Sequence, residues 1–248
     1  MPTPAPVALI TGSAHRLGAR TAQLLHDRGW NLVIHYRSRK EQADRLTETM
    51  NKQRENSAVA VGADLSEMAD ITRLGSEATA HWGRLDALVN NASVFYPNPT
   101  SEATSDDWDR IMHTNLKAPF FLLQACLPAL EESSGNVVNL IDIYSEKPLP
   151  EHPLYCASKA GLAALTRSWA KDLAPRVRVN GVSPGAILWP DGEAAVDAEY
   201  QNKILDKTPM KRTGTADDIA RTVVFLITEA PFITGQIISV DGGRSLNM

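Results

Sequence analysis

Short, uninterrupted apolar runs alternate along this chain with longer stretches in which apolar residues recur every three or four positions. The short runs are rich in β-branched residues and are typical of strands buried on both faces, whereas the longer spacing is typical of amphipathic helices. The predicted strands are 7–11, 31–36, 58–62, 85–89, 136–141, 177–182 and 237–240. The predicted helices are a stretch ending near residue 28, a polar stretch ending near residue 56, 67–82, two helices within 105–132, 153–173 and 216–228.

This alternation predicts the fold class. Parallel neighbouring strands need long crossover connections, and such crossovers are right-handed, so helices come to cover both faces of the sheet. We therefore expect an α/β fold, a single-domain Rossmann-like doubly wound parallel sheet of about seven strands. A chain of 248 residues suits one large domain of this kind, covering 1–248, better than two small ones.

The pattern is weakest between residues 185 and 214. Pro190, Gly192 and Pro209 interrupt a segment that is helical only around 194–205. In open α/β sheets, ligands bind beyond the carboxyl ends of the strands. This insertion is therefore either a lid over the substrate or a surface loop, and the pattern alone favours neither.

Composition and charge narrow the class of protein. The formal net charge is −4 with acidic and basic residues interspersed, which does not favour nucleic-acid binding. Cys126 and Cys156 show no metal-ligand spacing, which predicts buried free thiols, no metal site and a reducing compartment. The first residues lack the features of a secretion signal, and no apolar run approaches the ~18 residues that span a bilayer. We expect a cytoplasmic protein that binds neither nucleic acid nor membranes.

A glycine-containing turn follows the first predicted strand and opens the first predicted helix. At such a position, backbone N–H groups and the helix dipole can hold the pyrophosphate of a dinucleotide. Gly12 allows the tight turn, and Gly18 allows close packing of the helix on the sheet. Arg16 occupies a position where many dinucleotide folds have another glycine.

The end of the second predicted strand indicates which dinucleotide is bound. NAD sites commonly carry an acidic residue there, whereas the 2′-phosphate of NADP needs positive charge and hydrogen-bond donors. The segment 35–40 reads His-Tyr-Arg-Ser-Arg-Lys and contains no carboxylate. It therefore predicts NADPH, with Tyr36, Arg37 and Ser38 at the adenosine end, although a solvated helix start would have a similar composition.

Tyr155 and Lys159 lie four residues apart near the start of a long predicted helix and so share one face. A phenol has an ordinary pKa of ~10, and a neighbouring ammonium is expected to lower it. Reduction of a C=O or C=N bond leaves negative charge that must be protonated. Tyr155 could donate this proton, while Lys159 anchors the nicotinamide ribose.

The order and spacing of these motifs resemble those of the short-chain dehydrogenase/reductase family over essentially the whole chain. The matching elements are Gly12-x-x-x-Arg16-x-Gly18, Asn90-Asn91-Ala92, Asn115, Tyr155-x-x-x-Lys159, Pro184-Gly185 and Val240-Asp241-Gly242-Gly243. The resemblance implies that Asn115 joins a proton relay with Lys159. It also implies a set of cofactor-binding residues: Gly12, His15, Arg16, Leu17, Tyr36, Arg37, Ser38, Asp64, Leu65, Asn91, Ala92, Ser93, Tyr155, Lys159, Pro184 and Gly185.

Departures from the family pattern point to the substrate. Thirteen residues before Tyr155 the family usually has a serine, whereas this chain has Asp142. An ionised carboxylate cannot donate a proton to a carbonyl, but it can accept hydrogen bonds from an amino-pyrimidine or assist protonation of a ring nitrogen. Arg16 and the sequence from Ser93 to Phe95 are further departures. On their own, Phe95 would be read as a core side chain and Asp142 as a turn cap.

Together these departures resemble the pteridine reductases and, in the segment after Gly185, bacterial dihydromonapterin and dihydrofolate reductases. The resemblance implies catalysis by Asp142, Tyr155, Lys159 and Asn115, and NADPH-dependent reduction of dihydropterins or dihydrofolate. The implied substrate-binding residues are Arg16, Ser93, Phe95, Asp142, Tyr155, Leu188 and Trp189. A homotetramer is also implied, in which Arg244 could reach a pocket of another subunit. The alternatives are a generic carbonyl reductase, such as a 3-oxoacyl-thioester reductase, and a sensor that binds NADPH without turnover.

Overall fold

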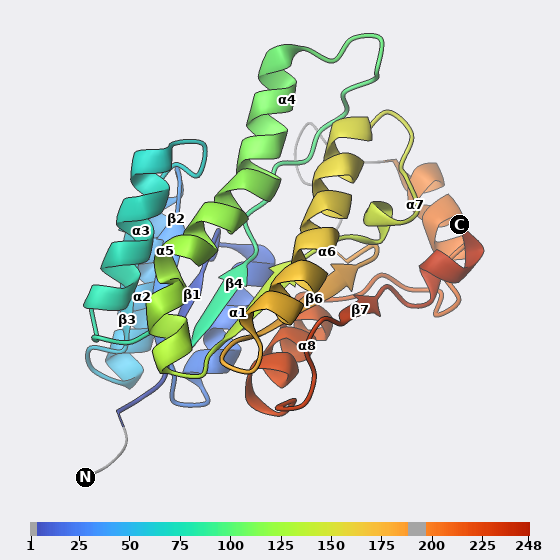
Figure 1. The fold of residues 1–248 in the computed structure, drawn as a ribbon. Coiled ribbons are helices and arrows are strands. Elements are labelled where there is room, and N and C mark those ends of the chain that lie inside the picture. The colour runs from blue at the N-terminus through green and yellow to red at the C-terminus, as the bar shows by residue number, and fades with distance from the viewer. Residues whose placement is uncertain (1–3, 188–196) are drawn as a thin grey trace.

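The computed structural model describes residues 4–187 and 197–248, and these form an α/β fold around one sheet (Figure 1). All seven strands are parallel, in the order β3-β2-β1-β4-β5-β6-β7, which confirms the predicted fold class. The strands are β1 (Val7–Ile10), β2 (Asn31–Tyr36), β3 (Ala58–Gly62), β4 (Ala87–Asn90), β5 (Asn136–Leu140), β6 (Arg178–Pro184) and β7 (Ile237–Val240).

Helices cover both faces of the sheet (Figure 1). One face packs against α1, α2 and α8, and the other against α3, α5 and α6, each with its own apolar cluster. The helices are α1 (Arg16–His26), α2 (Lys40–Gln53), α3 (Met68–Ala80), α4 (Ser105–Met112), α5 (Ala118–Glu132), α6 (Pro153–Leu173), α7 (Ala198–Asp206) and α8 (Ala216–Thr228). Since each central strand is buried on both faces, its burial does not alternate along the strand, and β1 is apolar throughout.

Local sequence signals set several helix starts. Thr104 caps α4 and Thr215 caps α8, and each belongs to a capping box with an aspartate three residues later. This motif satisfies backbone N–H groups that the first turn of a helix leaves unpaired. The predicted bounds of β2, β3, β7, α6 and α8 agree with the structure, and most of the other predicted ends lie within three residues of the observed ones.

A π-helical turn, η1 (His113–Lys117), joins α4 to α5 so that the three run on without a break. The sequence pattern predicted two helices here but not the π-turn. Such turns often occur at functional sites because they redirect a side chain from the regular helical ladder. In this chain the turn carries Asn115 and Thr114, both of which are buried.

The strand order changes direction between β1 and β4, which are neighbours in the sheet. Strands β2 and β3 extend the sheet on one side of β1, and β4 to β7 extend it on the other. Ligands bind at such a switch point, beyond the carboxyl ends of the two strands. In this protein the two segments that leave these ends carry Gly12 and Asn91.

Part of the predicted insertion at 185–214 is described by the structure. The helix expected around 194–205 corresponds to α7, which begins at Ala198. Leu188 and Trp189, which were predicted to bind substrate, lie outside the described residues. Within 4–187 and 197–248, no helix is long and apolar enough to cross a bilayer, and no cluster of side chains suited to a metal ion is found.

Candidate active site

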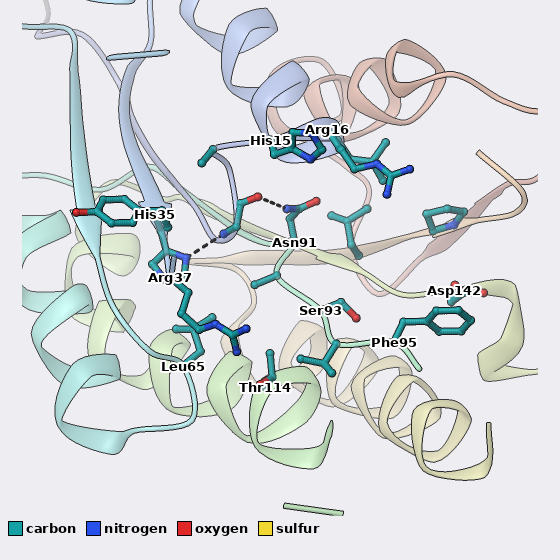
Figure 2. Close-up of a pocket in the computed structure, with 18 of the residues that line it drawn as sticks. His15, Arg16, His35, Arg37, Leu65, Asn91, Ser93, Phe95, Thr114 and Asp142 are labelled. Atoms are coloured by element: carbon teal, nitrogen blue, oxygen red, sulfur yellow. Dashed lines mark hydrogen bonds between the residues drawn. The ribbon is translucent and has the colours of Figure 1, made fainter. Parts of the chain in front are cut away.

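A cavity of about 550 Å³ opens at the switch point, beyond the carboxyl ends of the central strands (Figure 2). It runs from Arg37 and Leu65 at one end to Phe95 and Asp142 at the other. Every residue predicted to bind the cofactor lines it, although their individual roles stay predictions. Residues that line it and were not predicted are Ala14, His35, Arg39, Val94, Thr114, Leu140, Ile141 and Ile187.

The turn after β1 has the geometry that its glycines suggested. Gly12 has a φ of +62°, and a Cβ there would lie 3.1 Å from the backbone of Ala92. A Cβ on Gly18 would lie 2.7 Å from both the Asn91 amide nitrogen and the Gly12 carbonyl oxygen. Both positions therefore require glycine, because a side chain would push α1 and the β4 segment away from the turn.

Arg16 also has a left-handed backbone, with a φ of +52°. A non-glycine residue in this conformation costs roughly 1–2 kcal/mol. This cost explains why a glycine is common at the corresponding position of other dinucleotide folds. Arg16 lines the cavity, and its role in ligand binding stays a prediction.

Asn91 holds the turn rather than pointing away from it. Its Nδ2 donates to the carbonyl oxygens of Thr11 at 2.8 Å and Gly12 at 3.1 Å, and Figure 2 shows the side chain against the turn. The Thr11 hydroxyl in turn accepts from the backbone N–H groups of Asn91 and Ala92. The segments after β1 and β4 are thus tied together beneath the cavity.

The end of the cavity at β2 is rich in positive charge. Arg37 and Arg39 are exposed at its edge, and neither forms a salt bridge with any residue of the described chain. Hydrogen bonds from Ser66, together with the charge of Arg37, lower the pKa of Asp64 and keep it ionised. The glycine turn and this cationic end fit a dinucleotide that carries phosphate groups.

At the other end of the cavity, the Tyr155 hydroxyl donates a hydrogen bond to Asp142 Oδ2 at 2.8 Å. Asp142 Oδ1 accepts from the backbone N–H of Tyr144 at 3.0 Å and caps the short 3₁₀ helix η2 (Ile143–Ser145). Asp142 is therefore both a turn cap and the direct partner of the phenol. Lys159 Nζ donates to the Leu140 carbonyl oxygen at 2.8 Å and lies 5.8 Å from the centre of the Tyr155 ring.

The expected effect on the Tyr155 pKa is wrong in sign. Burial, followed by the negative charge of Asp142, raises the pKa of Tyr155 well above its ordinary value. Burial also raises the pKa of Asp142, and it lowers that of Lys159 to about 8. Because Tyr155 is the least acidic group of the three, it is a neutral phenol at pH 7 and can act as a proton donor.

In the described part of the chain, the side chain of Asn115 forms no hydrogen bond with Lys159. Its Nδ2 donates to the Val94 carbonyl oxygen and to the Ser158 hydroxyl, and its Oδ1 accepts from Val94 N–H at 2.8 Å and from the Ser93 hydroxyl. The predicted relay between Asn115 and Lys159 stays a prediction. Asn115 instead fixes the segment that carries Ser93 and Phe95 against α6.

Phe95 is not a core residue, because half of its surface is exposed. Its ring stacks on His152 with 4.6 Å between centroids and an interplanar angle of 14°. Its edge-to-face contact with Tyr155 has a centroid distance of 4.7 Å. Figure 2 shows the ring beside Asp142. A flat aromatic surface thus adjoins the Tyr155–Asp142 pair, and no sequence pattern had singled out His152 as its support.

Arg244 lies against its own chain, and the predicted approach to another subunit stays a prediction. It is 7% exposed, and Nη2 donates to the Tyr144 hydroxyl at 3.4 Å. Its charge opposes the effect of burial on the pKa of Asp142. The side-chain oxygens of Asp241 accept from the N–H groups of Gly243 and Ser245 and so fix the turn that carries Arg244.

The fold and this site define a dinucleotide-dependent oxidoreductase: a glycine turn lies at the switch point, and a buried phenol and lysine face the same cavity. A family model described as enoyl-(acyl carrier protein) reductase matches residues 12–245. The chain belongs to the short-chain dehydrogenase/reductase family. It is an NAD(P)-dependent oxidoreductase of that family and acts on a small molecule.

Relatives with two kinds of name are similar to this chain. Pteridine reductase 1 of Leishmania tarentolae is 37% identical over 98% of this chain and 97% of its own length. The 3-oxoacyl-(acyl-carrier-protein) reductase FabG of Staphylococcus aureus is 35% identical over 95% of this chain and 96% of its own. A putative ketoacyl reductase for granaticin synthesis from Streptomyces violaceoruber is 36% identical over 98% and 97%.

Proposed function

We propose that this protein reduces 7,8-dihydropterins or dihydrofolate to their tetrahydro forms with NADPH. The observation that carries the proposal is the 2.8 Å hydrogen bond from the Tyr155 hydroxyl to Asp142, next to the exposed ring of Phe95. An ionised carboxylate is an acceptor only, so it suits the N–H donors of an amino-pyrimidine better than a carbonyl oxygen. A flat pterin would also gain from stacking on Phe95.

The positive end of the cavity supports NADPH over NADH. Arg37 and Arg39 lie at the end of β2 without a salt-bridge partner in the described residues, where a 2′-phosphate could accept from them. Gly12 leaves room at the turn for a pyrophosphate, and Lys159 faces the cavity where a ribose would lie. When bound, the cofactor supplies a hydride to the carbon of the C=N bond.

The chain's own residues then handle the proton. Tyr155 is neutral at pH 7, so its hydroxyl can give a proton to the ring nitrogen that becomes an amine. Asp142 accepts from the same hydroxyl and holds it in place, and the phenolate regains its proton from solvent when the product leaves. Lys159 remains near the phenol ring as an ammonium below pH 8 and stabilises the transient negative charge.

The similarity to ketoacyl reductases supports a competing function, the reduction of a 3-oxoacyl thioester. In carbonyl reduction, negative charge develops on the carbonyl oxygen, and an ionised Asp142 beside that oxygen would oppose it. The charge on Asp142 is therefore the physical reason to favour a nitrogen heterocycle over a thioester.

Purified protein and NADPH can be combined in parallel with dihydrobiopterin, dihydrofolate and an acetoacetyl thioester, with loss of NADPH followed by absorbance. The proposal predicts turnover of one or both of the first two substrates. Turnover of the thioester alone would overturn it in favour of a carbonyl reductase, and NADPH binding without turnover would favour a sensor. The predicted homotetramer and the cytoplasmic location stay predictions, and sedimentation analysis can check the former.

A further inference from the structure

His35 is a buried histidine in the cofactor half of the cavity, and neither its burial nor its contacts follow from the sequence pattern. It is the fifth residue of β2 and is 2% exposed. Its ring lies between the glycine turn and the start of the loop after β3, as Figure 2 shows on the side of the turn. Histidines in such positions are usually held by hydrogen bonds at both ring nitrogens.

Both ring nitrogens of His35 have a partner. The backbone N–H of Gly12 donates to Nδ1 at 2.9 Å, and Nε2 lies 3.0 Å from the Ala63 carbonyl oxygen. A backbone N–H can only donate and a carbonyl oxygen can only accept. Nδ1 must therefore be unprotonated and Nε2 must carry the hydrogen, so the contacts define one neutral tautomer.

The backbone of His35 also forms hydrogen bonds with the glycine turn. Its N–H donates to the Ser13 hydroxyl at 3.1 Å, and its carbonyl oxygen accepts from Ser13 N–H at 3.0 Å. The Ser13 hydroxyl donates onward to the Ile10 carbonyl oxygen at 2.7 Å. Together with the hydrogen bond from the Gly12 N–H to the imidazole, these contacts join both the backbone and the side chain of His35 to the turn.

We infer that His35 is a positioning residue for the dinucleotide: its neutral Nε2–H imidazole fixes the glycine turn in its binding conformation. Arg37 follows two residues later at the cavity edge, so the same strand end places the turn and the cationic side chain together. Burial lowers the pKa of His35 and keeps it neutral, against the opposing charges of Asp64 and Asp70. The inference concerns cofactor binding and does not depend on which substrate is reduced.

Two variants of His35 distinguish its role as a hydrogen-bond acceptor for Gly12 from a role in core packing alone. His35→Leu removes the acceptor, whereas His35→Asn can place its amide oxygen near the position of Nδ1. His26→Leu is the matched control, because His26 is also buried, at 5% exposure, and its Nε2 lies 2.8 Å from the Ser57 hydroxyl. His26 ends α1, ten residues or about 15 Å along the helix from the turn.

Dissociation constants for NADPH can be measured by nicotinamide fluorescence, with melting temperatures of the unloaded proteins. We expect His35→Leu to weaken NADPH binding by about tenfold. A tenfold change in the dissociation constant corresponds to about 1.4 kcal/mol, which is within the range of the cost of leaving a buried N–H unpaired. His35→Asn should stay within about threefold of the wild type, and His26→Leu should lower the melting temperature without a change in affinity. Equal affinities for His35→Leu and His26→Leu would overturn the inference.

The tautomer provides a second measurement on the wild-type protein, which needs no variant to fold. Long-range ¹H–¹⁵N spectra of the unloaded protein should show His35 protonated at Nε2 alone at neutral pH. A spectrum with the proton on Nδ1, or on both nitrogens, would contradict the contact with Gly12 and overturn the inference. Neither the NADPH affinities nor the tautomer depends on pterin turnover. A failure of this inference can therefore be told apart from a failure of the proposed function.

Discussion

Replacement of Asp142 by serine tests the proposed chemistry directly. Serine stands at this position in most of the family, and its hydroxyl can still cap η2 by accepting from the Tyr144 N–H. The change removes the carboxylate that accepts from Tyr155 at 2.8 Å. It therefore separates the loss of charge at the active site from the loss of local structure.

The magnitude follows from that contact. A hydrogen bond to a charged acceptor contributes about 1.5–3 kcal/mol, and positioned acid–base catalysis contributes about 10²–10⁴-fold in rate. We expect kcat/KM for dihydrobiopterin to fall by about 10²–10⁴-fold in Asp142→Ser, while the affinity for NADPH changes by less than about twofold. Turnover of the acetoacetyl thioester should be kept or should rise, because a hydroxyl can donate to the developing oxyanion.

The assay is steady-state NADPH oxidation with each substrate, together with NADPH binding by fluorescence. Asp142→Asn is the matched variant, because the amide keeps the shape and an acceptor oxygen but carries no charge. It should lie between the wild type and Asp142→Ser in pterin turnover. If Asp142→Ser reduced dihydrobiopterin at the wild-type rate, or lost affinity for NADPH to the same extent as turnover, the assigned role of the carboxylate would be refuted.

Other parts of the site give further predictions. Arg37→Ala should weaken NADPH binding by about 10–100-fold and NADH binding far less, and equal losses in fluorescence titrations would contradict the 2′-phosphate assignment. Phe95→Ala should raise the KM for dihydrobiopterin by about 3–10-fold through lost stacking, whereas Phe120→Ala, at an exposed ring outside the cavity, should not. The kcat/KM profile should fall as pH rises through about 8, because Lys159 then loses the ammonium that assists the phenol. A profile that stays flat well above pH 8 would contradict this role.

The fold could be predicted because its signals are local. Apolar β-branched runs such as 31–36 and the capping box at Thr215 each specify an element within a few residues of sequence. The π-turn around Asn115 could not be predicted in this way, because it lies where α4 packs against α6 and α5 packs against α3, and these contacts join segments distant in sequence. The sequence of the turn resembles that of ordinary helix.

The resemblance to the family identified the candidate site residues, but it did not predict how their pKa values shift. The four-residue spacing of Tyr155 and Lys159 suggested that the ammonium would lower the pKa of the phenol. In the structure both groups are buried, and the phenol donates a hydrogen bond to the carboxylate of Asp142, whereas the ammonium of Lys159 lies 5.8 Å from the centre of the ring. Burial and a near negative charge raise the pKa, and neither can be read from a helical spacing. His35 was overlooked for a similar reason, since its partners Gly12 and Ala63 are distant in sequence.

Overall similarity is a poor guide to substrate in this family, and the structure gives a physical reason. Identities of 37% and 35% to relatives with different names extend over nearly the whole chain, so they reflect mainly the sheet, its helices and the glycine turn that all members need. In the function proposed above, the substrate would contact the end of the cavity where Phe95 and Asp142 lie. A single carboxylate there changes which atom can be protonated, because it replaces a hydrogen-bond donor with an acceptor. Substrate choice can therefore diverge through one or two side chains while the cofactor half of the cavity stays the same.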